Sequence, residues 1–156
     1  SCSNMSEEGY IEAIWLKRFK RGPMDAVTEA TMIPGKGLVV NANQGGRRQV
    51  TIMDARAWEM ATEELGVNID PAQRRANIMV RGINLANSRK RILCLGECRV
   101  RIFFEAKPCE RMDEVVWGLQ AALNQQWRGG VCAEVITGGT LAIKNTGDKY
   151  RVRWEN

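Results

Sequence analysis

The chain has 156 residues, which suits one domain with a sizeable core, and its 44% hydrophobic and 26% charged residues are typical of globular proteins. No apolar run approaches the ~20 residues of a membrane span, no secretory signal opens the chain, and we expect no membrane partner. Histidine is absent, which excludes Cys–His and Ser–His–Asp catalytic units, and the formal net charge of +5 favours an anionic partner.

The five cysteines also restrict the class of protein. An odd number cannot pair completely within one chain, so we expect a reducing, cytoplasmic location. Cys94 and Cys98 have C-x3-C spacing on two expected strands, and no pair has the C-x2-C spacing of a structural zinc site.

The first half of the chain reads as short strands and one helix. Strands are expected over residues 9–19, 24–32 and 49–53, with turns at 33–37 and 44–48. Asp54 is placed to cap a helix that ends at Gly66. The apolar residues at helical spacing are Ala57, Trp58, Ala61 and Leu65.

The second half repeats this pattern. A short turn or helix at Asp70-Pro71 precedes expected strands over 77–83, 92–95, 97–105, 131–137 and 149–154, and a second helix is expected over 113–123. Between 99 and 102, arginine alternates with valine or isoleucine, which indicates one charged and one buried strand face. Many short strands, glycine turns and two helices predict a mainly β, barrel-like fold. We expect a single domain over residues 9–154 and a flexible N-terminus over 1–8, in which Met5 is the natural start.

Lys107-Pro108-Cys109-Glu110-Arg111 is the segment most suggestive of chemistry. Cys109 follows a rigid proline after an expected strand, and neighbouring Lys and Arg side chains favour the thiolate, which is the nucleophile and metal ligand. The alternative is that Cys109 is a small buried hydrophobe, as many free cysteines are.

Three loops could bind an anion beside this cysteine. Gly45-Gly46-Arg47-Arg48 and Arg128-Gly129-Gly130 combine glycines with arginine, so that backbone N–H groups and guanidinium forks could hold a phosphate. Neither has the spacing of a dinucleotide-binding or P-loop motif. In Arg74-Arg75-Ala76-Asn77, the asparagine could bind a heteroaromatic edge or a phosphate. Each loop, taken alone, could equally be an ordinary solvated turn.

The ordered series of these segments resembles the MOSC domain family, named after the C-terminal part of molybdenum cofactor sulfurase. The resemblance spans roughly residues 9–154. The matching segments are Arg75-Ala76-Asn77-Ile78, Gly82-Ile83, Pro108-Cys109, Arg128-Gly129-Gly130-Val131, Gly138-Gly139 and Gly147-Asp148. The resemblance implies a barrel-like MOSC fold, similar to the β-barrel of pyruvate kinase, with two or three short helices.

The resemblance also implies a cofactor and a set of site residues. The cofactor would be the molybdenum cofactor (molybdopterin), and Cys109 would be the catalytic residue, as a persulfide carrier or metal ligand. The residues that would bind the pterin phosphate are Arg48, Arg75, Asn77, Arg128, Gly129 and Gly130. A soft metal such as molybdenum prefers thiolate sulfur, which agrees with this assignment.

The resemblance does not decide which activity or which partners the protein has. A molybdenum-dependent oxidoreductase, a sulfur transferase and a protein without enzymatic activity are all compatible with it. The expected partners are a pterin phosphate or another small anion, and a redox or sulfur-donor protein; pyridoxal phosphate is not an expected ligand.

One loop departs from the family pattern. Family members usually carry a Gly-Asp pair after a Gly-Leu, whereas here Gly37-Leu38 is followed by Val39-Val40-Asn41. An altered ligand or a lost activity would be the consequence.

The alternative function is a non-catalytic module that binds small anions or single-stranded nucleic acid, because basic β-barrels with exposed aromatic residues can stack bases. Against this, Trp58 and Trp117 have core spacing on expected helices, which predicts that they are packed. Trp127, beside Arg128, is the tryptophan expected near a site.

Overall fold

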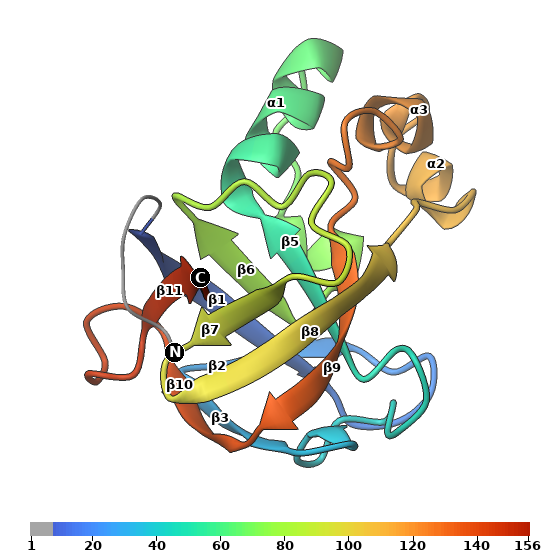
Figure 1. The fold of residues 1–156 in the computed structure, drawn as a ribbon. Coiled ribbons are helices and arrows are strands. Elements are labelled where there is room, and N and C mark those ends of the chain that lie inside the picture. Colours follow the sequence, from blue (N-terminus) through green and yellow to red (C-terminus); the bar gives the residue numbers. More distant parts are fainter. Residues whose placement is uncertain (1–7) are drawn as a thin grey trace.

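The computed structural model describes residues 8–156, in which the strands wrap into a barrel and the helices gather at one end of it (Figure 1). Residues 1–7, most of the expected flexible N-terminus, lie outside the described range. Glu8 was expected in that flexible segment, but it is the first residue of strand β1.

Seven strands close the barrel, in the order β1-β11-β7-β8-β9-β5-β6 and back to β1. All neighbouring pairs are antiparallel except β5 and β6. Strand β2 extends from β1, and β10, β3 and β4 form a separate three-stranded sheet. The strands are β1 (Glu8–Lys17), β2 (Met24–Val27), β3 (Glu29–Ile33), β4 (Gly37–Leu38), β5 (Val50–Asp54), β6 (Ile78–Arg81), β7 (Ile92–Leu95), β8 (Cys98–Glu105), β9 (Val131–Thr137), β10 (Gly139–Ala142) and β11 (Arg151–Trp154). The predicted mainly β, barrel-like fold is confirmed.

Strand β8 shows how the sequence produces the barrel. Val100 and Ile102 are fully buried in the barrel core. Arg99 and Arg101 point the other way and pair with Glu155 and Glu134, at 2.7 and 3.0 Å. Side chains alternate between the two faces of a strand, so the apolar residues of this alternating pattern fill the core and the charged residues lie on the outer face.

Helix α1 (Ala55–Leu65) forms as predicted. The side chain of Asp54 accepts a hydrogen bond from the backbone N–H of Arg56, and Gly66 ends the helix with a φ of 67°. Trp58 is buried, as predicted, in a second apolar cluster between α1, the barrel and the other helices.

The predicted single helix over 113–123 is wrong. The structure has two short helices, α2 (Arg111–Val115) and α3 (Leu119–Leu123). Val116 is extended and Gly118 has a φ of 96°, and the Asp113 carboxylate accepts hydrogen bonds from the N–H groups of Gly118 and Gln120. The break turns Trp117 outward, so it is 85% exposed instead of packed.

Smaller differences from the predicted fold concern the strands. The expected strand over 24–32 is interrupted after Val27, and β10 had not been predicted.

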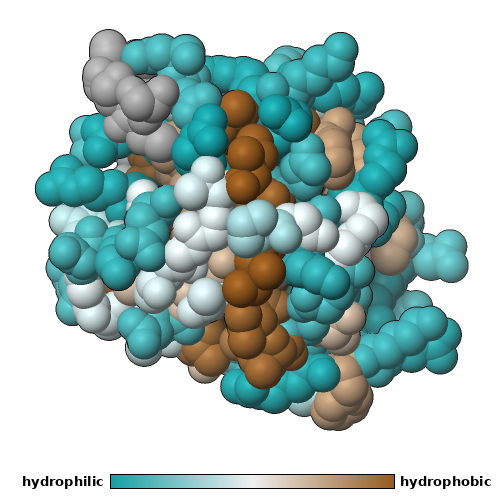
Figure 2. Space-filling model, turned by 60° about the horizontal axis from the view of Figure 1, so that its bottom comes forward, coloured by the Kyte–Doolittle hydropathy of each residue, from teal (hydrophilic) through white to brown (hydrophobic). Residues whose placement is uncertain are grey.

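Within residues 8–156, no helix has the length and apolar character needed to cross a membrane. Figure 2 shows a narrow apolar strip between polar side chains on one face of the molecule.

Candidate thiol and anion site

A cavity of about 380 Å³ brings Cys109 together with basic side chains from four segments of the chain. Every charged side chain that lines it is a lysine or an arginine, and no carboxylate does. The six basic residues are Lys17, Arg48, Arg74, Arg75, Lys107 and Arg111. Such a cavity attracts anions, and guanidinium groups can bind phosphate or carboxylate through two hydrogen bonds each.

Cys109 lies at the entrance to helix α2, and its thiol is free and exposed. Strand β8 ends at Glu105, four residues before Cys109, and the intervening Pro108 is buried. On the other side, the Cys109 carbonyl accepts a hydrogen bond from the N–H of Met112. Proline fixes the backbone just before the cysteine. The alternative of a small buried hydrophobe does not apply to Cys109.

Lys17 and Arg75 stand close enough to Arg111 for their charges to interact. Partial burial lowers the pKa of both groups, and the positive charge of Arg111 lowers each pKa further. None of these three forms an ion pair with a carboxylate within residues 8–156. A bound anion would relieve this repulsion, so the three cations form a candidate anion subsite.

Arg74 supports the wall of the cavity. Its Nε donates to the Gly129 carbonyl at 3.0 Å, and its Nη2 donates to the Ala106 carbonyl at 2.8 Å. A Cβ on Gly129 would come within 2.5 Å of the Ala106 carbonyl, so only glycine permits this approach. Burial lowers the pKa of Arg74, which is nevertheless charged at neutral pH because free arginine titrates so high.

A second thiol, that of Cys132 on strand β9, also lines this cavity and is buried. Burial raises its pKa, an effect that Arg48 and Arg74 partly oppose, and Arg48 Nη1 lies 3.9 Å from its Sγ. Cys132 is therefore a protonated, enclosed thiol, whereas Cys109 is open to solvent.

Three of the predicted site residues, Cys109, Arg48 and Arg75, line this cavity together. Arg75 adopts a left-handed backbone with φ of 65° after the short 3₁₀ helix η1 (Pro71–Arg74), and its Nη2 donates to the Gly22 carbonyl at 2.6 Å. Gly129 and Gly130 shape the segment behind Arg74, because a Cβ on Gly130 would meet the Ile52 carbonyl at 2.2 Å.

Asn77 and Arg128 are buried and do not line the cavity. Asn77 accepts a hydrogen bond from the N–H of Thr51 and donates to Trp15 and Asn41, so it joins three segments. Arg128 forms a two-point ion pair with Glu64, both N–O distances being 2.9 Å. Trp127 is half-buried and packs against the barrel core.

Sequence reasoning did not assign Lys17, Arg74, Lys107, Arg111 and Cys132 as site residues, although Arg74 belongs to one of the three loops proposed to bind an anion. Lys107 and Arg111 were noted only as neighbours of Cys109. Lys17 ends a strand, and Arg74 and Cys132 become neighbours of Cys109 only through barrel closure. The paired arginines at 74–75 were a usable signal, because both members face the same cavity.

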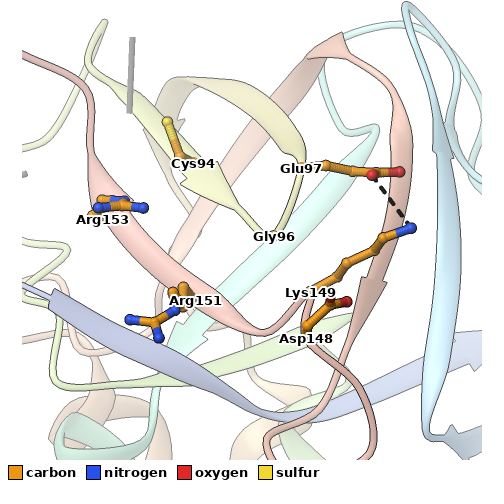
Figure 3. A pocket seen from close by; sticks show the side chains of 7 residues that line it. All are labelled: Cys94, Gly96, Glu97, Asp148, Lys149, Arg151 and Arg153. Atoms are coloured by element: carbon orange, nitrogen blue, oxygen red, sulfur yellow. Dashed lines mark ion pairs between the residues drawn. The ribbon is translucent and has the colours of Figure 1, made fainter. Parts of the chain in front are cut away.

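Another cavity, of about 230 Å³, lies beside the turn between β7 and β8 (Figure 3). It differs from the thiol cavity around Cys109 in its balance of acidic and basic side chains. There Glu97 and Asp148 stand among Lys149, Arg151 and Arg153, and Glu97 pairs with Lys149 at 3.3 Å. Acid and base neutralise each other in that cavity, so it is a weaker candidate for binding an anion.

The fold and site together define a closed seven-stranded barrel with an open thiol in a basic cavity. No protein-family model matches the chain, and no curated protein matches it. Among solved structures, the chain is similar to the YuaD protein of Bacillus subtilis, with a TM-score of 0.78, 18% identity and full coverage of both chains. It is also similar to YiiM from Escherichia coli, with a TM-score of 0.67, 14% identity, and coverage of 94% of this chain and 70% of that chain. At these identities, the likeness shows the fold alone.

Proposed function

We propose that the basic cavity binds the molybdenum cofactor and that Cys109 contributes the sulfur atom of the site. The observation that carries the proposal is that one free, exposed thiol shares a cavity with six cations and no carboxylate. The MOSC-like series of motifs in the sequence supports the same cofactor.

The donor set fits the chemistry of this cofactor. A pterin phosphate is an anion that Lys17, Arg75 and Arg111 would hold, and molybdenum is a soft metal that a thiolate binds well. Within residues 8–156, no group of three or more His, Cys, Asp or Glu side chains could hold a metal ion. The bound cofactor would supply two-electron redox chemistry, while the chain's own residues bind its anionic group and place a sulfur beside it.

Sulfur transport is a second role for the same thiol. The Cys109 thiolate would attack the outer sulfur of a donor protein's persulfide, forming a Cys109 persulfide and releasing the donor's thiolate. The exposure of Cys109 favours this step because the donor must reach the sulfur directly.

The test is the pterin content of protein purified from a host that makes the cofactor. The wild type should carry pterin, detected by fluorescence after oxidation. Arg111→Gln should lower retention about tenfold, since a hydrogen bond to a charged group contributes roughly 1.5–3 kcal/mol. The matched control is Arg89→Gln, an exposed arginine outside the cavity, which should retain wild-type pterin.

Absence of pterin from the wild type, or equal pterin in the Arg111→Gln and wild-type proteins, would contradict the proposal. The competing function, binding of single-stranded nucleic acid, predicts an oligonucleotide affinity that falls steeply with salt and does not change in Cys109→Ser.

A further inference from the structure

A larger cavity, of about 520 Å³, adjoins the thiol cavity. The loop that precedes β5 forms it, and Asn43 and Arg48 line both cavities. A ligand held near Cys109 could therefore continue past Arg48 into the second cavity, where Arg47 is the further charged residue.

The two arginines of this loop are held in place by aromatic rings of strand β8. The guanidinium carbon of Arg47 lies 5.6 Å from the ring centre of Phe103 and 5.3 Å from that of Phe104. That of Arg48 lies 5.3 Å from the ring centre of Phe104. Stacking orients a guanidinium group without consuming its N–H donors. The donors of Arg47 stay available for an anion, whereas Arg48 Nη1 already contacts the Cys132 Sγ at 3.9 Å.

The loop itself is fixed at both ends. Gln44 Nε2 donates to the carbonyls of Leu38 and Asn41, at 2.7 and 2.8 Å. Gln49 Nε2 donates to the Gly46 carbonyl at 2.9 Å. Neither Arg47 nor Arg48 forms an ion pair with a carboxylate of the described chain. The second cavity thus presents two pre-positioned cations.

The two cavities together contain more cations than one phosphoryl group needs. A phosphate monoester carries about −1.5 to −2 charge at pH 7, which Lys17, Arg75 and Arg111 would already balance. Arg48 lines both cavities and Arg47 lines only the second, so these two cations would remain without an anion.

We propose that the ligand carries two linked phosphoryl groups, the first in the thiol cavity and the second over Arg47 and Arg48. The inference rests on the proposed function in that the thiol cavity binds an anionic ligand, and it assigns that ligand to the class of diphosphates. Arg47 then selects for the second phosphoryl group and has no role in binding the first.

Calorimetric titration with inorganic phosphate and with pyrophosphate tests this assignment. Arg47→Gln should lower the affinity for pyrophosphate about tenfold and change the affinity for phosphate by less than twofold. The exposed control Arg89→Gln should change neither affinity by more than twofold. If Arg47 acted only through general charge attraction, Arg47→Gln would lower the affinity for both probes alike.

Equal losses for both probes in Arg47→Gln, no loss for either, or no binding of pyrophosphate to the wild type would overturn the inference. Because both probes are inorganic, the result is independent of the cofactor. Selective loss of pyrophosphate in a protein that purifies without pterin would uphold the diphosphate site and reject the cofactor. If the protein retains pterin but Arg47→Gln loses affinity equally for phosphate and pyrophosphate, the cofactor proposal would stand and the diphosphate site would be rejected.

Discussion

Replacing Val40 by asparagine should stabilise the protein. Val40 has a φ of 62° and is 55% exposed, in the loop where the MOSC-like pattern has a glycine. The left-handed conformation costs an L-residue roughly 1–2 kcal/mol, and a β-branched side chain makes it a genuine outlier. Asparagine tolerates this conformation, so the substitution should recover most of that strain.

The neighbouring Val39 provides the matched control. It is 42% exposed and does not have a positive φ. Val39→Asn and Val40→Asn remove similar side chains from the same loop, so the loss of apolar contact is nearly common to both. The Val40→Asn protein should therefore be more stable than Val39→Asn by about 1–2 kcal/mol. For a domain of this size, that difference corresponds to roughly 2–8 °C in Tm.

Urea unfolding of both variants and the wild type, followed by circular dichroism, measures this difference. If Val40→Asn is no more stable than Val39→Asn, the backbone strain at Val40 is not a significant cost and the reasoning is refuted.

The remaining predictions concern the core, the cavity wall and pH. Trp58→Ala should cost roughly 3–5 kcal/mol in urea unfolding, whereas Trp117→Ala should change stability by less than about 0.5 kcal/mol; similar losses would contradict the assigned burial. Arg74→Lys should cost about 1–3 kcal/mol because two buried carbonyls lose their donor, and an unchanged midpoint would argue against that role. Burial raises the pKa of Cys98 from 9.0 to about 12, so the folded chain holds this proton more tightly than the unfolded chain. Stability should therefore fall as pH rises from 9 towards 12, and Cys98→Ala should reduce that fall in unfolding curves.

Much of the barrel could be predicted because it depends on local patterns. The alternation along β8 and the cap at Asp54 both act within a few residues, and both predictions are confirmed. The break between α2 and α3 could not be predicted from apolar spacing, since it depends on a positive φ at Gly118 and on Asp113 bonding to the backbone beyond it.

The site was harder to predict than the fold. Cys109 could be singled out from its immediate neighbours, and the structure places it in the basic cavity. Arg128 carried an equally suggestive glycine-arginine motif, but its guanidinium pairs with Glu64, a residue 64 positions away. Lys17 had no local signal at all. Which arginines face a cavity depends on long-range partners that spacing along the chain does not reveal.

The molybdenum content of purified Cys109→Ser tests the central claim most directly. Wild type and variant would be expressed side by side with added molybdate, and metal per protein chain measured by mass spectrometry. The proposal predicts bound molybdenum in the wild type and in Arg89→Gln, and a severalfold loss in Cys109→Ser. Equal molybdenum in Cys109→Ser and wild type, or none in either, would contradict it.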